Sequence, residues 1–494
     1  MSGRQATKGP VLWTIDEILQ ATGGTLDHVP SPAIVESDRP IRGISIDSRT
    51  TAPDHAFFAI RGDRFDGHDF VESALQAGAA VAVISRERAA DFAGKQGCRL
   101  VVPDVLVALE DLGRAARARM NGRVIAITGS VGKTGTKEAL RLALCPSGTV
   151  HAADKSFNNH WGVPLSLARM PRDTDFGIFE IGMNHPGEIR PLVKMVRPHI
   201  AIITTVEAVH LEYFKSVEEI ALAKAEIFEG IEPGGTVLLN ADNVHFDFLR
   251  ALAAKRPEIS SIESFGQTAL ADVHIVSMET RGTHTDVSAD LYGRQISYRN
   301  GAPGKHLVVN SLAVIAAAYR AGGDVEKACA ALAGVSAPKG RGERWDLIVD
   351  DGTAVLIDES YNANPVSMRA ALDLLGQFEP EGGRRIAVLG DMLELGEAGP
   401  DLHAGLVEAI LDNSVDRIYC CGPLMHALWQ RLPTERRGAY ADRSDGLAQS
   451  VVEGVSTGDV VMVKGSLGSR MGPLVEALLT RYRAVKSGGE IPQR

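Results

Sequence analysis

The segment VIAITGSVGKTGTKEAL (residues 124–140) joins an apolar strand to the start of a helix through a turn that contains glycine. Backbone N–H groups at such a turn attract phosphate, Lys133 can reach the outer phosphates, and the Thr134 hydroxyl can bind Mg²⁺. A full Walker pattern has glycine where this chain has Ile127, so the match is the shorter TGSVGKT. An ordinary strand–helix turn is the alternative, but GKT directly after an apolar strand favours an ATP or GTP site.

A carboxylate and an imidazole follow two further apolar segments. Glu180 ends FGIFE, and His210 comes just after HIAIITTVEAV. Side chains at strand ends of an α/β sheet suit a second divalent ion near the nucleotide. Taken singly, each is more often a loop residue, and in a chain with 14 histidines His210 alone carries little weight.

A lysine interrupts the apolar face of the predicted helix EEIALAKAEIFEG (residues 218–230). Ile220, Ala223, Lys224, Ile227 and Phe228 share that face, whereas most of the glutamates lie off it. Lysine is rarely buried without a partner, so Lys224 either extends its ammonium to water, forms an ion pair, or is chemically altered. The residues alone favour the first two possibilities.

An α/β scaffold must position these groups. Short apolar strands alternate with helical stretches from RVIAITGS onward, and a second series of strands begins after APKGRGER. The predicted fold is α/β with an N-terminal α/β domain (residues 1–103), a central P-loop-type parallel-sheet domain (104–338) and a C-terminal Rossmann-like α/β domain (339–494). The Gly-, Pro- and Arg-containing stretch Pro338–Arg344 is the predicted hinge.

Composition restricts the class of protein. A chain of 494 residues is too long for one core, and 45% apolar with 23% charged residues is ordinary for a soluble globular protein. The net charge of −10 argues against a general nucleic-acid surface. Five cysteines without metal or disulfide spacing, together with the lack of a signal-like or membrane-spanning apolar run, predict a cytoplasmic protein with no membrane insertion.

Motifs in all three predicted domains resemble the Mur ligase family, and within it the branch that adds D-alanyl-D-alanine. The matching stretches, in family order, are TGSVGKTGTKE, FNNHWGVPLSL, FEIGMNHPGEI, AVHLEYFKSVEEIALAKAEIF, LNADN, APKGRGE, DESYNANPVSMRAAL, VLGDMLELG and VKGSLGSRM. The SYNANP and GDMLELG stretches are specific to that branch. The N-terminal DSRTTAPDHAFFAIRGDRFDGHDF resembles the part of the family that binds the UDP end of the substrate.

The resemblance implies an ATP-dependent amide ligase of peptidoglycan precursor synthesis. Such an enzyme joins UDP-N-acetylmuramoyl-tripeptide to D-alanyl-D-alanine through an acyl phosphate and releases ADP and phosphate. Lys133, Lys224, His210 and Glu180 would be catalytic. Mg²⁺ would be held by Thr134, Glu180, His210 and Lys224, with Lys224 present as a carbamate formed with carbon dioxide.

The resemblance also assigns contacts to ATP and to the UDP substrate. The implied ATP-binding residues are Thr128, Gly129, Ser130, Val131, Gly132, Lys133, Thr134, Asn310, Arg341, Asp358, Tyr361, Asn362 and Asn364. Ser48, Arg49, Asn158 and Asn159 are the implied substrate contacts, and the chain is expected to act as a monomer. Two departures from the family, Glu359 in DESYNANP and the pair His160–Trp161, bear only on the substrate side.

Two other classes of protein stay open. A folate-polyglutamate ligase shares the ATP chemistry, although DGHDF and SYNANP argue against it. A P-loop switch or motor protein would hydrolyse nucleotide without joining an acid to an amine, and would leave the third domain unexplained. The residues do not decide whether the third residue of the tripeptide is diaminopimelate or lysine.

Overall fold

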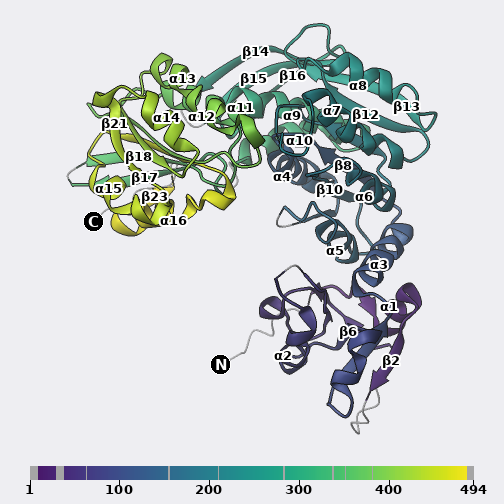
Figure 1. Cartoon of the computed structure of the whole chain (residues 1–494). Helices are drawn as coiled ribbons and strands as arrows, with labels where there is room; N and C mark the ends of the chain where they lie inside the picture. The colour runs from purple at the N-terminus through teal and green to yellow at the C-terminus, as the bar shows by residue number, and fades with distance from the viewer. Residues whose placement is uncertain are drawn as a thin grey trace, which may run out of the picture.

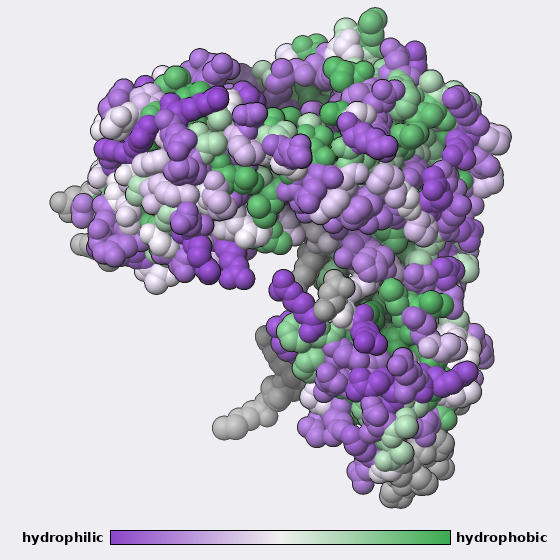
Figure 2. Space-filling view, in the orientation of Figure 1, coloured by the Kyte–Doolittle hydropathy of each residue, from purple (hydrophilic) through white to green (hydrophobic). Residues whose placement is uncertain are grey.

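The computed structural model describes residues 9–28, 38–62, 64–153, 156–209, 211–281, 284–336, 339–350, 352–380 and 382–486. The predicted α/β architecture of three domains is confirmed (Figure 1). The N-terminal domain lies at one end of the molecule and the C-terminal domain at the other, and the central domain connects them. In the space-filling view, an open hollow lies between the N-terminal and C-terminal domains, next to the central domain (Figure 2).

The N-terminal domain is built on a mixed sheet in the order β2–β7–β6–β5–β4, in which only β2 runs antiparallel to its neighbour. Its strands are β2 (Thr25–His28), β4 (Gly43–Ser45), β5 (His55–Phe58), β6 (Val81–Ser85) and β7 (Cys98–Val102), and a separate ladder pairs β1 (Trp13–Thr14) with β3 (Pro40–Ile41). The helices are α1 (Ile15–Thr22), α2 (Val71–Gln76) and α3 (Val105–Arg119). Leu109 and Leu112 of α3 pack into the core of this domain, together with Leu165 of the central domain.

The central sheet has the order β16–β15–β14–β13–β12–β11–β8–β10–β9. Its strands are β8 (Arg123–Thr128), β9 (Val150–Ala152), β10 (Phe176–Glu180), β11 (Ile200–Ile203), β12 (Gly235–Asn240), β13 (Ile259–Gly266), β14 (Val273–Arg281), β15 (His284–Leu291) and β16 (Arg294–Asn300). Pairing is parallel from β9 to β14, as predicted. The antiparallel extension β14–β15–β16 was not predicted, because β14 is mostly exposed, β15 and β16 alternate buried with more exposed residues, and all three lack the apolar runs of the buried strands.

Helices cover both faces of the parallel part of this sheet. They are α4 (Lys133–Leu144), α5 (Gly162–Ala168), α6 (Ile189–Val196), α7 (Val217–Ala225), α8 (Phe246–Ala253), α9 (Lys305–Arg320) and α10 (Val325–Ala331). Alternate residues of β8 serve the two cores: Ile125 and Ile127 pack with α4 and α9, whereas Val124 and Ala126 pack with the side of α5, α6 and α7. Burial on both faces explains why β8 reads as a continuous apolar run.

The predicted helix over residues 218–230 is shorter than expected. The α-helix α7 ends at Ala225, and the last turn continues as the 3₁₀ helix η5 (Glu226–Gly230). At Gly230 the backbone approaches α6 so closely that an added Cβ atom would lie 2.3 Å from the Val193 carbonyl oxygen. The five residues predicted to share an apolar face are nevertheless all buried, Lys224 included.

The C-terminal sheet has the order β21–β20–β19–β22–β18–β17–β23, with parallel pairing from β21 to β18. Its strands are β17 (Glu343–Val349), β18 (Gly352–Glu359), β19 (Arg385–Gly390), β20 (Arg417–Cys421), β21 (Arg437–Ala441), β22 (Val460–Lys464) and β23 (Arg483–Lys486). The helices are α11 (Pro365–Gly376), α12 (Gly399–Ala404), α13 (Leu406–Asp412), α14 (Met425–Arg431), α15 (Ala448–Glu453) and α16 (Gly472–Arg481). Cys420 and Cys421 are buried thiols in β20, and burial raises the pKa of Cys421 to about 11.

None of the helices in the described ranges is long and apolar enough to cross a membrane.

Candidate active site

The glycine-containing turn leaves β8 where the sheet order reverses. Strand β8 lies between β10 and β11, so the turn that follows Thr128 opens at a topological switch point, the usual ligand-binding position in such sheets. Gly132 adopts φ +92°, which disfavours any residue with a side chain. An added Cβ atom at Gly132 would lie 2.5 Å from Asn310 Nδ2, and one at Gly129 would lie 1.9 Å from Thr204 Oγ1. Asn310, predicted to contact nucleotide, therefore packs directly on the loop.

The loop has the form of a phosphate cradle. Helix α4 begins at Lys133 with Gly132 at the N-cap position, and no side chain of the described residues caps its first N–H groups. Free N–H groups at a helix start favour an anion. The Thr128 hydroxyl is buried and has no hydrogen-bond partner within the described residues. Ser130 fixes the loop instead, because its hydroxyl exchanges hydrogen bonds with the backbone of Glu207, and Thr204 Oγ1 donates to the Val131 carbonyl at 2.6 Å.

Lys133 lies at the centre of this cradle. Its half-buried ammonium donates to the Gly129 carbonyl at 2.5 Å, a bond that a phosphate could replace. Burial lowers the pKa of Lys133, the carboxylate of Glu180 opposes that change, and the guanidinium of Arg341 adds to it. Arg341 belongs to the C-terminal domain, so a charge from that domain acts on Lys133 of the phosphate loop.

Glu180 ends β10 beside the loop, as predicted. Its buried carboxylate accepts a hydrogen bond from Thr134 Oγ1 at 2.9 Å and another from Asn158 Nδ2 at 2.7 Å. Ser156, which was not predicted, places its hydroxyl 3.1 Å from Thr134 Oγ1. A hydroxyl and a carboxylate in contact are oxygen ligands of the kind that Mg²⁺ prefers. Within the described residues, no group of three or more His, Cys, Asp and Glu side chains completes a metal site.

Lys224 is buried, with 2% of its surface exposed. Burial, and to a smaller extent the charge of Lys133, hold the pKa of Lys224 well below its ordinary value. In the part of the chain that the structure describes, its amine has no hydrogen-bond or ion-pair partner. Two of the possibilities given above, an ammonium extended into water and an ion pair with a described residue, therefore do not fit this structure. His210, the fourth predicted ligand, lies outside the described residues.

The predicted nucleotide contacts of the C-terminal domain fall into two groups. The Arg341 guanidinium stacks over the Tyr361 ring at 4.4 Å from its centre, and Asp358 is buried nearby, with a pKa that burial raises. Asn362 Oδ1 accepts from Ala363 N. Asn364 instead caps helix α11 in a reciprocal pair with Ser367, so its side chain already has a structural role.

The predicted substrate contacts also divide. Asn158 binds Glu180 and so joins the site directly. Asn159 Oδ1 accepts from Gly162 N at the start of α5, which is a turn-forming role. Ser48 and Arg49 lie in a short 3₁₀ turn of the N-terminal domain, far from the loop in sequence, and the exposed Arg49 side chain pairs with Asp47.

The RFDGHDF segment has a structural role at its histidine. His68 is buried, its Nδ1 donates to Asp66 at 2.6 Å, and its Nε2 accepts from Ser85 N at 2.9 Å. Both ring nitrogens are therefore occupied.

The N-terminal and central domains meet close to Asn158. Trp161 packs against Gly62, where an added Cβ atom would lie 3.0 Å from the indole, and Arg169 Nε donates to the Ile44 carbonyl at 2.8 Å. The segment 158–161 therefore leads from Glu180 to the N-terminal domain. The tryptophan in NNHWGVP thus serves the contact between domains, a role that the sequence pattern did not indicate.

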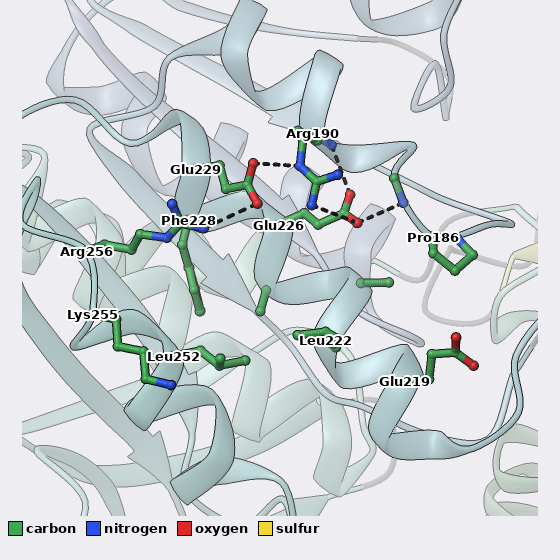
Figure 3. Close-up of a pocket in the computed structure, with 13 residues that line it drawn as sticks. Pro186, Arg190, Glu219, Leu222, Glu226, Phe228, Glu229, Leu252, Lys255 and Arg256 are labelled. Carbon is green, nitrogen blue, oxygen red and sulfur yellow. Dashed lines mark hydrogen bonds and ion pairs between the residues drawn. The ribbon is translucent and has the colours of Figure 1, made fainter.

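A groove of about 550 Å³ lies on the outer face of α7, separate from the phosphate loop (Figure 3). It is lined by Leu222, Ala223, Ala225 and Phe228, by Leu252 and Lys255, and by the charged cluster Arg190, Glu226, Glu229 and Arg256. The groove contains none of the predicted site residues. We therefore place the candidate site at the phosphate loop, because of the side chains there, and not in this groove.

Comparisons with known proteins cover nearly the whole chain. Residues 40–117 match the Mur ligase family, catalytic domain; residues 127–318 match the Mur ligase middle domain; and residues 343–467 match the Mur ligase, glutamate ligase domain. A Bacillus subtilis protein named UDP-N-acetylmuramoyl-tripeptide–D-alanyl-D-alanine ligase is 32% identical over 94% of this chain and 98% of its own length.

Two solved structures are similar along most of their length. MurF from Acinetobacter baumannii has a TM-score of 0.81 at 29% identity, covering 95% of this chain and 99% of that one. MurF ligase from Thermotoga maritima, in complex with ADP, has a TM-score of 0.73 at 24% identity, covering 89% of this chain and 97% of that one.

Proposed function

The chain belongs to the Mur ligase family, and on that premise we propose that it is the ATP-dependent ligase that joins D-alanyl-D-alanine to UDP-N-acetylmuramoyl-tripeptide. One observation carries the proposal: at one edge of the central sheet Thr134 of the loop donates a hydrogen bond to Glu180, and the charges of Glu180, Arg341 and the buried Lys224 each interact with that of Lys133. The name of the 32% identical relative supports the particular amine and acid.

The proposed reaction begins with a carboxylate, which is a poor electrophile because it would have to expel oxide. An oxygen of the tripeptide carboxylate attacks the γ-phosphorus of ATP, the bond to ADP breaks, and an acyl phosphate forms. The amine of D-alanyl-D-alanine then attacks the acyl carbon, loses a proton, and releases phosphate that carries the former carboxylate oxygen. Activation divides one difficult step into two easier ones.

The chain's own residues would align the reactants and neutralise charge. Lys133 exchanges its bond to the Gly129 carbonyl for the outer phosphates, and the free N–H groups at the start of α4 receive phosphate oxygens. Arg341 brings a second cation from the C-terminal domain. Tyr361, stacked under Arg341, and the buried Asp358 offer a surface for the adenine and ribose. The ADP in the Thermotoga relative supports a nucleotide here.

Mg²⁺ would be held by Thr134 and Glu180, joined by His210 and a carbamate on Lys224, and would supply charge neutralisation at the phosphates. Lys224 meets the chemical requirement for carbamate formation, because a buried lysine with a lowered pKa keeps a neutral, nucleophilic amine. The carbamate would replace this neutral amine with an anionic oxygen ligand.

Ser48 and Arg49 remain our proposed contacts for the uridine end, and residues 1–103, 104–338 and 339–494 our proposed domains. The separate sheets β2–β7, β8–β16 and β17–β23 support this division, and α3, which begins just after residue 103, packs on the N-terminal core. A substrate bound at Ser48 would reach Glu180 along the segment 158–161.

A substrate panel tests the function. Purified protein with ATP and Mg²⁺ is given UDP-N-acetylmuramoyl-tripeptide, with diaminopimelate or lysine as the third residue, and D-alanyl-D-alanine, and ADP release is followed together with product mass. We expect stoichiometric ADP and pentapeptide with at least one tripeptide. Phosphate release with folate and glutamate instead would favour a folate-polyglutamate ligase, and hydrolysis with neither pair would favour a P-loop switch.

A further inference from the structure

Glu226 lies two residues beyond Lys224, at the point where α7 changes into the 3₁₀ helix η5. We propose that Glu226 is a positioning residue for the ligase reaction: its carboxylate fixes the Lys224 helix to the loop that follows Glu180. The inference rests on the proposed function and adds a residue that does not touch the reactants.

The contacts of Glu226 are made to backbone and not only to side chains. Glu226 is 7% exposed, its Oε1 accepts from Gly187 N at 2.7 Å, and its Oε2 accepts from Arg190 N at 3.1 Å. Helix α6 has no cap from its own N-cap residue, Glu188, so Glu226 caps it from another element. A carboxylate bound to helix-start N–H groups also complements the helix dipole. Figure 3 shows these bonds next to the Arg190 guanidinium.

The capped loop begins at the active site. Residues 181–188 join Glu180 to α6, and the start of this loop is held by bonds from Ile181 N to the Ile127 carbonyl and from Gly182 N to the Asn158 carbonyl. Its far end is held by Glu226. A continuous series of hydrogen bonds therefore runs from the phosphate-loop strand through the loop after Glu180 to the segment that carries Lys224.

A second contact ties the same loop to the other end of α7. The His185 ring lies 4.4 Å from the Tyr213 ring, and Tyr213 precedes the first residue of α7 by four positions. His185 is itself fixed by Glu188 at 3.0 Å. The helix with Lys224 is thus attached to the loop at both ends, and Glu226 supplies the buried, charged attachment.

Glu229 offers a matched control in the same turn of helix. Its carboxylate lines the same groove and pairs with Arg190 at 2.7 Å and Arg256 at 3.2 Å, but it makes no bond to the loop backbone. Glu226→Gln and Glu229→Gln remove the same charge with the same change of shape. In wild type both carboxylate oxygens of Glu226 accept hydrogen bonds from backbone N–H groups. Only Glu226→Gln therefore places an amide N–H against a backbone N–H.

The experiment compares the two variants in three measurements: steady-state kinetics, dependence of the rate on Mg²⁺ concentration, and hydrogen exchange of the Gly187 and Arg190 amides without substrate. For Glu226→Gln we expect kcat to fall about 10- to 100-fold with a higher half-saturating Mg²⁺ concentration, as is typical for loss of a group that orients a metal ligand. The KM for ATP should stay within about threefold, because the phosphate loop keeps its contacts. Exchange at the two amides should accelerate, and Glu229→Gln should match wild type in all three.

Three results would overturn the inference. The first is faster amide exchange in Glu226→Gln with kcat unchanged. The second is an equal loss of kcat in Glu229→Gln. The third is a change of KM in Glu226→Gln with no change of kcat. If Glu226→Gln does not fold, Glu226→Asp takes its place, because it keeps the charge with a shorter reach. Its kcat must then be lower than that of wild type, with an unchanged KM for ATP. The proposed function is tested separately, by turnover of the wild-type protein with D-alanyl-D-alanine. The kcat and KM of each variant are compared as ratios to the wild-type values, measured with whichever amine the wild-type protein accepts.

Discussion

Replacing Lys224 by methionine should abolish ligation and yet stabilise the fold. Methionine has nearly the length of lysine and suits the apolar surroundings of Ile220 and Ile227. In wild type Lys224 is buried, with 2% of its surface exposed, and burial lowers the pKa of its amine; burying a polar group that lacks a hydrogen-bond partner costs about 1–3 kcal/mol. The methionine variant should therefore have a free energy of unfolding about 1–3 kcal/mol higher in CO₂-depleted buffer.

The pH dependence gives the sign of this effect. The pKa of Lys224 is lowered in the folded protein, so the unfolded chain binds the proton more tightly. The free energy of unfolding of wild type then rises with pH between the folded pKa and the unfolded value of about 10.4. Methionine does not titrate. The advantage of the variant should be largest near pH 7 and should shrink as the pH is raised toward 10.

The assays are urea unfolding at several pH values and ADP release at saturating substrates. We expect kcat of Lys224→Met to fall at least ~100-fold, because a metal ligand is lost. Added bicarbonate should raise both the activity and the unfolding free energy of CO₂-depleted wild type, since carbon dioxide would bind only the folded state, and should change neither in Lys224→Met. Acetate or formate should partly rescue Lys224→Ala by filling the vacated position.

Lys255→Met is the matched control, because Lys255 is exposed on the groove at the outer face of α7 and should change neither stability nor rate. Normal turnover of Lys224→Met would refute the carbamate. A variant less stable than wild type at neutral pH would refute the burial of an unpaired amine.

Three further outcomes are expected. Lys133→Ala should lose at least ~100-fold in kcat with an unchanged circular dichroism spectrum, since its ammonium bonds only a loop carbonyl; activity within a few-fold of wild type would remove it from the site. Gly132→Ala, whose Cβ atom would meet Asn310 at 2.5 Å, should raise the KM for ATP about tenfold or more, whereas Gly135→Ala, which points into open space, should not; equal effects would argue against the cradle. Nucleotide with UDP substrate should reduce the radius of gyration in small-angle scattering if the predicted hinge at Pro338–Arg344 closes; of this stretch, Pro338 lies outside the described residues. An unchanged radius would argue against closure.

The parts of the structure that were predictable from sequence are those with strong local patterns. Strands such as β8 and β10 are buried on both faces, so their apolar runs identified them, and polar residues at their ends identified Glu180 and the loop. Because parallel strands end at one edge, sequence order was enough to bring Thr134 and Glu180 together.

Contacts that depend on tertiary geometry could not be read from the chain. Ser156 reaches Thr134, and Thr204 packs on Gly129, through side chains whose local sequences resemble ordinary loops. Asn364 was assigned to nucleotide by resemblance, yet its side chain caps α11, a role equally consistent with an Asn-Pro pair at a helix start. No role was predicted for Glu226, because nothing in the local sequence reveals that it caps α6.

Oxygen transfer from the acid to phosphate tests the central claim most directly. UDP-N-acetylmuramoyl-tripeptide labelled with ¹⁸O in its reacting carboxylate is converted with ATP and D-alanyl-D-alanine, and both products are analysed by mass spectrometry. ATP-driven ligation through an acyl phosphate predicts one ¹⁸O atom in each released phosphate and one retained in the new amide carbonyl. Unlabelled phosphate, or ADP release without pentapeptide, would contradict it.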